Sequence, residues 1–222
     1  MATKRVAVVL SGCGFLDGSE IYESVCTLLA IDRAGASYQA FAPDKPQLDV
    51  VNHAVQQPAA GERRNVLVEA GRLARGKILP LAKLKMADHD ALVLPGGFGA
   101  AKNLVNYAVK GAGCDIDPDV ARVLKEAHSL KKPIGAICIA PVVVARALGA
   151  DHHPTLTIGG DDPTAADIEK LGGCHKKAAA TDIVVDETNR IVSTPAYMLA
   201  ERISQVSDGV SKLVDRVLAM CR

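Results

Sequence analysis

The sequence predicts an α/β fold, with a doubly wound, mostly parallel sheet, helices on both faces and a short hairpin near the C-terminus. Two observations support this prediction. Short apolar runs, typical of strands buried on both faces, alternate with longer segments of helical spacing. Glycine- and proline-rich turns separate them. With 222 residues, the chain is expected to form one domain (residues 1–222) that can bury a complete sheet.

The first half of the chain contains three apolar runs that predict strands, at residues 6–10, 38–42 and 91–94. Apolar residues at helical spacing predict helices at residues 19–34, 65–75 and 100–107. In the first of these helices, Ile21, Val25, Leu28, Leu29 and Ile31 would form the buried face, and Gly35 would end the helix. Residues 47–85 are otherwise less regular.

In the second half, Asp117 is the predicted N-cap of a helix that runs to Leu130, with Pro118 in its first turn. The remaining predicted strands are residues 134–138, 155–158, 182–185 and 190–193, and the last two would pair as a hairpin. The remaining predicted helices are residues 140–148, 163–171 and 198–220.

The stretch from Pro133 to Pro141 predicts a sharp turn from a strand into a helix, with Cys138 at the turn. Such a turn lifts the side chain at its apex out of the sheet and leaves backbone N–H groups free at the positive helix end. A thiol held there is expected to have a lowered pKa and to react as a thiolate. The alternative is that Cys138 is one more small buried hydrophobic residue, as free cysteines usually are.

Three breaks in the pattern are expected at one edge of the sheet, where ligands bind in doubly wound folds. These are residues 11–20, residues 95–99 and Cys138. We expect them to form one pocket. The glycines of residues 95–99 free backbone N–H groups, and those of Gly97 and Ile139 would form an oxyanion hole. The alternative for residues 95–99 is a flexible connection to the next helix.

Glu20 has two interpretations. It fits a helix cap, because Asp17 precedes it by three residues as in a capping box. Alternatively, its carboxyl group faces the pocket and exchanges a proton with a bound thiol or its adduct. The nearby Gly12, Cys13 and Gly14 only faintly resemble a dinucleotide fingerprint, and a tight turn beside a small ligand is the favoured interpretation.

None of the six histidines directly follows Cys138. His152 and His153 are the best candidates for a histidine partner, because they come soon after the predicted turn, although a solvated loop is the favoured interpretation. Neither this pair nor Cys174 with His175 has the spacing of a complete metal site, so we expect no metal.

Composition excludes several classes of partner. The chain has 26 basic and 25 acidic residues and 3% aromatic residues, so neither a nucleic acid nor a membrane surface is expected to bind. The longest uncharged apolar stretch, residues 134–145, is too short to span a bilayer. The strand pattern begins by Arg5, which leaves no room for a signal peptide. Six scattered cysteines suit reduced thiols, and we expect a cytoplasmic protein.

Several motifs together resemble the ElbB family, which is named for an isoprenoid-biosynthesis glyoxalase or enhancing lycopene biosynthesis protein. That family is a branch of the PfpI and class I glutamine amidotransferase-like superfamily, whose fold is flavodoxin-like. The resemblance covers nearly the whole chain. It rests on residues 9–14 (VLSGCG), 17–20 (DGSE), 41–44 (FAPD), 64–67 (RNVL), 95–104 (PGGFGAAKNL), 138–141 (CIAP) and 194–197 (TPAY).

The resemblance implies that Cys138 is the nucleophile and that Glu20 contacts its sulfur. The expected pocket also includes Gly12, Cys13, Gly14, Phe98, Lys102, Asn103 and Pro195. One departure stands out. Glutamine amidotransferases of the superfamily carry a late histidine and glutamate, but residues 193–198 contain neither, and Ile139 stands where PfpI-type proteases carry a histidine. Both amide-cleaving activities therefore lack their general base.

The activity that the resemblance implies is the conversion of glyoxal and other small 2-oxoaldehydes to glycolate or its analogues, without glutathione, metal or another cofactor. A deglycase-type activity on glyoxal adducts of amines is a related expectation. The alternatives are a redox or regulatory protein with a reversibly oxidised Cys138, and a metabolite-binding protein without turnover. We expect a homodimer whose only other partner is a small aldehyde.

Overall fold

The computed structural model describes residues 3–221 and contains a central sheet of seven strands. The strands run in the order β10-β11-β7-β6-β1-β2-β5, and every neighbouring pair is parallel except β10 and β11. Their bounds are β1 Arg5–Val9, β2 Ser37–Ala42, β5 Ile78–Pro80, β6 Ala91–Leu94, β7 Ile134–Ile137, β10 Val184–Asp186 and β11 Ile191–Thr194. The predicted fold class and the antiparallel hairpin are confirmed.

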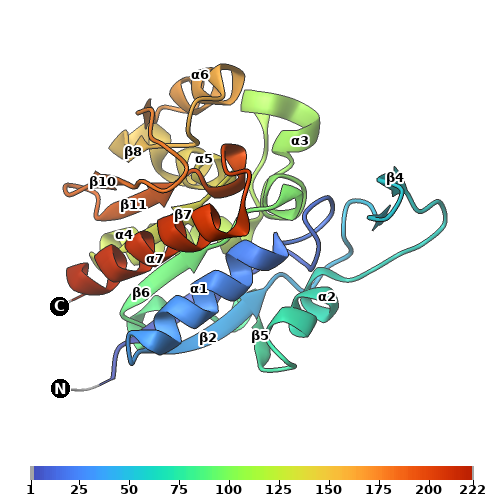
Figure 1. Cartoon of the computed structure of the whole chain (residues 1–222), viewed down its shortest axis with the longest axis horizontal. Coiled ribbons are helices and arrows are strands. Elements are labelled where there is room, and N and C mark those ends of the chain that lie inside the picture. Colours follow the sequence, from blue (N-terminus) through green and yellow to red (C-terminus); the bar gives the residue numbers. More distant parts are fainter. Residues whose placement is uncertain (1–2, 222) are drawn as a thin grey trace.

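Helices cover both faces of this sheet (Figure 1). On one face, α1 (Ile21–Arg33), α2 (Val66–Leu73) and α7 (Ile203–Met220) contribute to one apolar core, with α1 and α7 side by side. On the other face, α4 (Pro118–Ser129), α5 (Ala140–His152) and α6 (Asp162–Lys170) contribute to a second core. Side chains of β1 alternate between the two, so that Val6 and Val8 join the first core and Ala7 and Val9 the second.

Shorter elements lie around the carboxyl edge and the periphery. Two small sheets pair β3 (Val51–Asn52) with β4 (Gln57–Pro58) and β8 (Thr155–Leu156) with β9 (Cys174–His175). The segment that carries β4 projects from the body of the molecule (Figure 1). The remaining helical turns are η1 Leu81–Lys83, η2 Met86–Asp88, η3 Ala100–Leu104, α3 Tyr107–Lys110, η4 Gly111–Gly113 and η5 Ala196–Met198.

Two predicted helices have other bounds in the structure, and one strand was not predicted. The predicted helix at residues 100–107 is a five-residue π turn, η3, followed by the separate α3. The last helix begins at Ile203 rather than residue 198, because the chain first makes the 3₁₀ turn η5 after Ala196, whose φ is 44°. The edge strand β5 was missed, since three residues that end in proline give almost no periodic signal.

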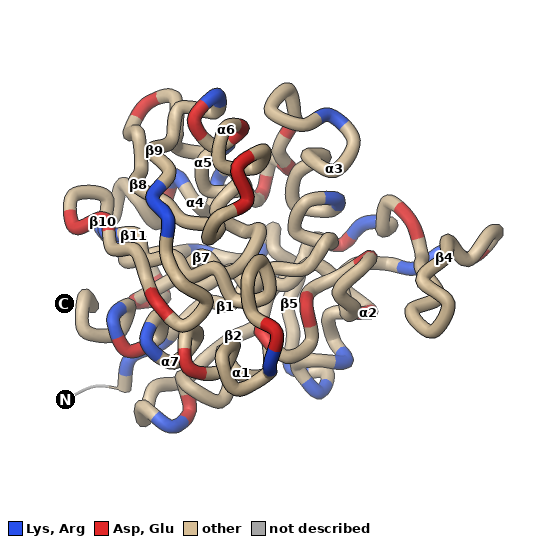
Figure 2. The backbone as a smooth tube through the Cα atoms, turned by 45° about the horizontal axis from the view of Figure 1, so that its top comes forward, with Lys and Arg blue, Asp and Glu red and all other residues tan. Residues whose placement is uncertain are grey.

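Acidic and basic residues are interspersed along the whole backbone (Figure 2). Within residues 3–221, no helix combines the length and the apolar character that a bilayer crossing needs.

Candidate functional site

Cys138 lies at the sharp turn that the sequence predicts. β7 ends at Ile137, Cys138 takes a left-handed backbone conformation with φ 61°, and α5 begins at Ala140. The backbone N–H of Cys138 donates to the carbonyl oxygen of Thr194 in the neighbouring β11, at 2.9 Å. A left-handed conformation is unfavourable for a residue with a Cβ atom, so the surrounding sheet must hold it in place.

The two other predicted breaks meet at this turn. The backbone N–H of Glu20 donates to the Gly96 carbonyl oxygen at 3.0 Å, and Phe98 N–H donates to Phe15 at 2.7 Å. Gly96 permits this approach because it has no side chain. A Cβ atom at this position would lie 2.5 Å from the Cβ of Cys138 and 2.8 Å from a carboxyl oxygen of Glu23. The loops therefore join the cysteine at one edge of the sheet, as predicted.

The carboxyl group beside the Cys138 sulfur belongs to Glu23. This side chain is fully buried and accepts hydrogen bonds from the backbone N–H groups of Gly96 (3.0 Å) and Tyr197 (3.3 Å). It also shares a hydrogen bond with the thiol of Cys138. Burial, and then the nearby Glu20 carboxylate, raise the pKa of Glu23 from 4.5 to about 8, so the carboxyl group is mostly protonated at neutral pH.

The expected contact between Glu20 and the Cys138 sulfur is therefore wrong. Glu20 is the N-cap of α1, and its carboxylate accepts the backbone N–H of Glu23 at 2.6 Å. It also lines the cavity, and burial raises its pKa. Both interpretations of Glu20, as a cap and as a cavity residue, thus hold in this structure. The sulfur contact falls to Glu23 because Glu23 lies almost one helical turn further along and points towards the sheet.

Glu23 was missed because the buried face of α1 was predicted from its apolar residues alone. The buried side chains of α1 include Glu23, Ser24 and Thr27. Ile21, Val25 and Leu29, which were assigned to the buried face, are instead 40–47% exposed. The row of small and polar residues three or four positions apart was the pattern that pointed to Glu23.

The pKa of the Cys138 thiol is raised well above 9, which contradicts the predicted lowering. Burial is the largest cause, and the Glu23 carboxylate adds to it. The backbone N–H groups of Gly97 and Ile139 point at the sulfur and lower the pKa, as the helix-end argument expects, but their effect is smaller. The thiol is thus protonated at neutral pH, and its proton must leave during any nucleophilic step.

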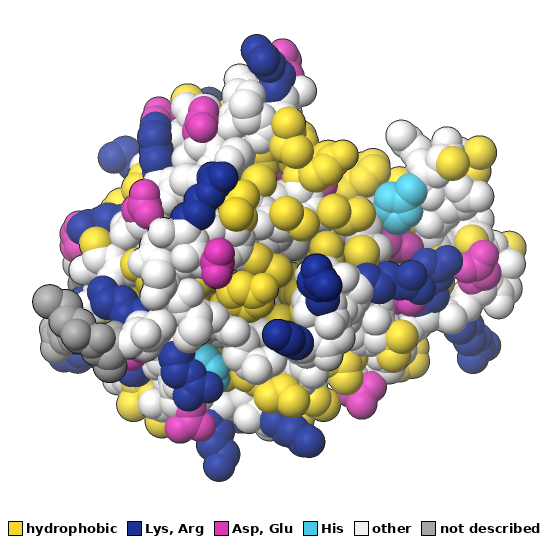
Figure 3. All heavy atoms as spheres, turned by 60° about the horizontal axis from the view of Figure 1, so that its bottom comes forward, with side chains coloured by type: hydrophobic (Ala, Val, Ile, Leu, Met, Phe, Trp, Pro, Cys, Tyr) yellow, Lys and Arg dark blue, Asp and Glu magenta, His cyan; other side chains and the backbone are white. Residues whose placement is uncertain are grey.

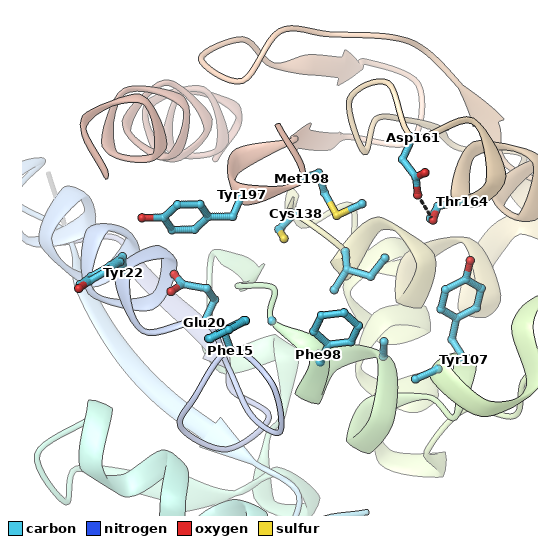
Figure 4. A pocket seen from close by; sticks show the side chains of 14 residues that line it. Phe15, Glu20, Tyr22, Phe98, Tyr107, Cys138, Asp161, Thr164, Tyr197 and Met198 are labelled. Carbon is cyan, nitrogen blue, oxygen red and sulfur yellow. Dashed lines mark hydrogen bonds between the residues drawn. The ribbon is translucent and has the colours of Figure 1, made fainter. Parts of the chain in front are cut away.

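Cys138 opens onto a cavity of about 620 Å³ (Figure 4). Glu20, Tyr22 and Tyr197 lie on one side of Cys138, and Asp161 and Thr164 lie on the other (Figure 4). The complete lining is Phe15, Glu20, Tyr22, Gly97, Phe98, Ala101, Tyr107, Ala108, Cys138, Ile139, Asp161, Thr164, Tyr197 and Met198. These side chains are mostly apolar, and none of them is lysine, arginine or histidine. The surface view shows hydrophobic side chains gathered in hollows of one face (Figure 3).

Of the seven further pocket residues predicted, only Phe98 lines this cavity. The other six, for which the prediction is wrong, are Gly12, Cys13, Gly14, Lys102, Asn103 and Pro195. Gly12, Cys13 and Gly14 lie in the loop after β1, Lys102 and Asn103 in η3, and Pro195 directly before η5.

Asn103 and Lys102 hold those loops in place. The buried Asn103 side chain donates to the carbonyl oxygens of Ser11 (2.9 Å) and Asp17 (3.0 Å). Lys102 pairs with Asp49 at 2.8 Å and donates to the Leu16 carbonyl oxygen at 2.9 Å. These bonds fix the loop after β1, so both residues stabilise the surroundings of the cavity without lining it.

Cys13 also faces away from the cavity. Its thiol lies among the charges of Glu69, Arg72 and Asp17, and burial raises its pKa. The helix α2, which carries Glu69 and Arg72, does not contribute to the cavity.

His152 and His153 lie at the far end of α5 from Cys138. A helix of 13 residues is about 20 Å long, so neither ring reaches the thiol. The His152 ring packs on His128 with centroids 4.0 Å apart, and the His153 ring contacts the Gly172 carbonyl oxygen at 2.8 Å. Both side chains are exposed, as the favoured interpretation expects, but Asp151 and His152 belong to the last turn of the helix and only His153 follows it. Across residues 3–221, no group of three or more His, Cys, Asp or Glu side chains is placed to hold a metal ion.

Comparison with known proteins gives consistent results. The family model described as DJ-1/PfpI family matches residues 15–157. The human protein named glutamine amidotransferase-like class 1 domain-containing protein 3, mitochondrial, is 45% identical over 225 residues, covering 97% of this chain and 83% of that protein. The rat ES1 protein homolog, mitochondrial, is 44% identical, covering 97% and 84%.

A solved structure extends the comparison to three dimensions. The crystal structure of an isoprenoid biosynthesis protein with amidotransferase-like domain from Ehrlichia chaffeensis is 37% identical to this chain. It covers 97% of this chain and 99% of its own, with a TM-score of 0.90. Both mammalian relatives are named mitochondrial, so the cytoplasmic location stays a prediction.

Proposed function

This chain belongs to the DJ-1/PfpI family, and from that membership we propose that it is a glyoxalase-like enzyme. In this proposal it converts glyoxal to glycolate through a hemithioacetal on Cys138, and needs neither glutathione nor a metal ion. The observation that carries the proposal is the pairing of a protonated Cys138 thiol with the buried Glu23 carboxyl group at the end of an accessible cavity.

The first step is the addition of the thiol to the aldehyde carbon. Glu23 acts in its ionised form, which a pKa of about 8 makes available in a minor fraction of molecules at neutral pH. Its carboxylate takes the proton of Cys138 while the carbon–sulfur bond forms, and the carbonyl electrons move to oxygen. The N–H groups of Gly97 and Ile139 are placed to stabilise that oxyanion. Glu23 then returns the proton to the oxygen.

The second step moves hydrogen between the two carbons. The Glu23 carboxylate removes the proton from the carbon bonded to sulfur, and the neighbouring carbonyl oxygen is protonated, which gives an enediol. The hydroxyl group on the carbon bonded to sulfur then loses its proton while the neighbouring carbon gains one, which leaves a thioester of glycolate with Cys138. Water then attacks the thioester, releasing glycolate and restoring the thiol. The sum is one glyoxal and one water giving one glycolate, so no redox partner is required.

The cavity supports this chemistry over the cleavage of amides. An amidotransferase-type triad uses a histidine to protonate the leaving amine. No histidine belongs to the cavity lining, and the two histidines on α5 lie at its far end. The proposed reaction has no amine leaving group, and a carboxyl group suffices for the proton transfers. Removal of glyoxal adducts from amines would use the same addition to Cys138.

The regulatory alternative, in which Cys138 is reversibly oxidised, needs a reactive thiolate. The raised pKa of Cys138 counts against it.

The test is glycolate formation from glyoxal with EDTA present and glutathione absent. We expect steady turnover by the wild-type protein and none by Cys138→Ala. Cys174→Ala is the matched control, because Cys174 is exposed and lies outside the cavity; it should keep the wild-type rate. Glycolate formation by Cys138→Ala at the wild-type rate, or none by the wild-type protein, would refute the proposal.

A further inference from the structure

The shape and charge of the cavity identify a narrower substrate class. We propose, building on the proposed glyoxalase function, that the preferred substrates are 2-oxoaldehydes with a bulky apolar group and no negative charge, of which aryl glyoxals are the simplest. The same cavity discriminates against 2-oxoaldehydes that carry a carboxylate or phosphate.

The cavity is much larger than glyoxal. A cavity of about 620 Å³ falls in the range that encloses drug-sized ligands, roughly 300–1,000 Å³. Glyoxal has only four non-hydrogen atoms and leaves most of this volume unfilled. A ligand attached to Cys138 therefore has room for a ring-sized group beyond the two reacting carbons.

The residues that line the cavity are mostly apolar or aromatic. Phe98, Ile139 and Met198 give the region around Cys138 an apolar lining, and Phe15 and Tyr107 add aromatic rings on either side (Figure 4). Phe98 is 51% exposed although it is a large apolar side chain. An aryl group in the cavity would cover such surfaces and gain the free energy of apolar burial.

The lining of the cavity carries negative but no positive charge. Glu20 and Asp161 are the only charged residues among those that line the cavity, and both are acidic. The ammonium group of Lys102 lies 5.9 Å from the centre of the Phe98 ring, but it is bound to Asp49 and the Leu16 carbonyl oxygen. An anionic ligand would lose its hydration here and gain no opposite charge.

Asp161 and Thr164 lie at the end of the cavity away from Glu20 (Figure 4). There the Asp161 carboxylate accepts the hydroxyl of Thr164, and it can accept a further hydrogen bond. A substrate with a donor group at its distal end would meet this carboxylate, whereas a carboxylate in the same position would face a like charge. Asp161 is thus the residue that we assign to the discrimination against anions.

The experiment compares kcat/KM for glyoxal, phenylglyoxal and two para-substituted phenylglyoxals of nearly equal shape, one with a carboxylate and one with a carboxamide. Burial of a ring the size of a phenylalanine side chain predicts that phenylglyoxal exceeds glyoxal by about 10–100-fold. The carboxylate should be used at least about tenfold less well than the carboxamide. The isosteric pair removes differences in size.

Variants separate the cavity from the intrinsic reactivity of each aldehyde. Phe98→Ala and Met198→Ala should each lower the ratio of phenylglyoxal to glyoxal. Tyr38→Ala, which changes an aromatic residue outside the cavity, should keep that ratio. Asp161→Asn should narrow the gap between carboxylate and carboxamide.

The outcomes distinguish the two proposals. No turnover of any aldehyde would overturn the proposed function itself. Turnover of glyoxal with a phenylglyoxal ratio at or below one, or equal use of carboxylate and carboxamide, would overturn only the substrate class. Unchanged ratios in both Phe98→Ala and Met198→Ala would also overturn it.

Discussion

Glu23 and Cys138 form a buried pair in which both groups are protonated at neutral pH. Burial raises the pKa of Cys138, and repulsion between a thiolate and the Glu23 carboxylate raises it further. Burial and the Glu20 carboxylate raise that of Glu23. At neutral pH Glu23 therefore keeps a proton that an exposed glutamate would have lost, and in the proposed mechanism its ionisation activates the thiol.

This arrangement predicts an effect of pH on stability. In the unfolded chain Glu23 ionises near 4.5, but in the folded protein it ionises near 8. Between these values unfolding releases a proton, so the free energy of unfolding falls as pH rises. At about 1.4 kcal/mol per pKa unit, the loss from pH 4 to pH 9 is on the order of 5 kcal/mol.

Glu23→Gln cannot ionise and should be spared this loss. Urea unfolding at pH 4.5, 7 and 9 should show the stability of the variant, relative to wild type, improving as pH rises. Glu201→Gln is the control, because it removes an exposed carboxyl group and should follow the wild type. A constant difference between wild type and Glu23→Gln across this range would contradict the raised pKa.

At the scale of elements, the site depends on how closely two loops approach the turn after β7. The Pro95–Gly99 segment packs on the loop after β1 through backbone contacts, with Gly99 N–H donating to the Gly18 carbonyl oxygen at 2.9 Å. Gly96 fits between Cys138 and Glu23. The spacing of the catalytic pair therefore depends on the absence of one Cβ atom.

Gly96→Ala should separate this pair. The added methyl group would lie 2.5 Å from the Cβ of Cys138, and overpacking of this kind typically costs about 1–3 kcal/mol. We expect lower stability by urea unfolding and a large loss of glyoxal turnover. Gly113→Ala is the matched control, because nothing lies within 4 Å of its Cβ position. Wild-type activity in a folded Gly96→Ala protein would argue against this geometry.

The elements also show where sequence patterns are sufficient. β6 could be predicted to the residue and β7 to within one residue, because each is buried on both faces and bounded by turn residues. The orientation of α1 could not be predicted from its apolar residues. Its sheet-facing side carries Glu23, Ser24 and Thr27, which complete the site, and leaves Val25 exposed. Periodicity identifies a helix, but packing decides which face is buried.

At the scale of the whole molecule, the fold explains why the predicted breaks meet. Parallel strands bring their carboxyl ends to one edge, so the loops after β1, β6 and β7 had to be neighbours. Which side chains of those loops enter the cavity could not be predicted. Asn103 and Lys102 point back into the loops they hold together, and Tyr197 and Met198 enter the cavity from the 3₁₀ turn after β11.

The protonation state of Cys138 also depends on the whole molecule. The helix end at Cys138 has the effect expected from the sequence, because the N–H groups of Gly97 and Ile139 favour the thiolate. Burial, together with the Glu23 carboxylate, outweighs it, and burial depends on segments far apart in the chain. A local motif could locate the nucleophile but not its protonation state.

The most direct test of the account compares Glu23→Gln with Glu20→Gln in the conversion of glyoxal to glycolate. Glu23→Gln should lower kcat/KM by about 10²–10⁴-fold and abolish the rise in rate towards pH 8 that we expect of the wild-type protein. Glu20→Gln keeps an amide oxygen for the Glu23 N–H and should lose far less. The opposite result, a near-normal rate in Glu23→Gln and a severe loss in Glu20→Gln, would contradict the assignment of Glu23 as the base.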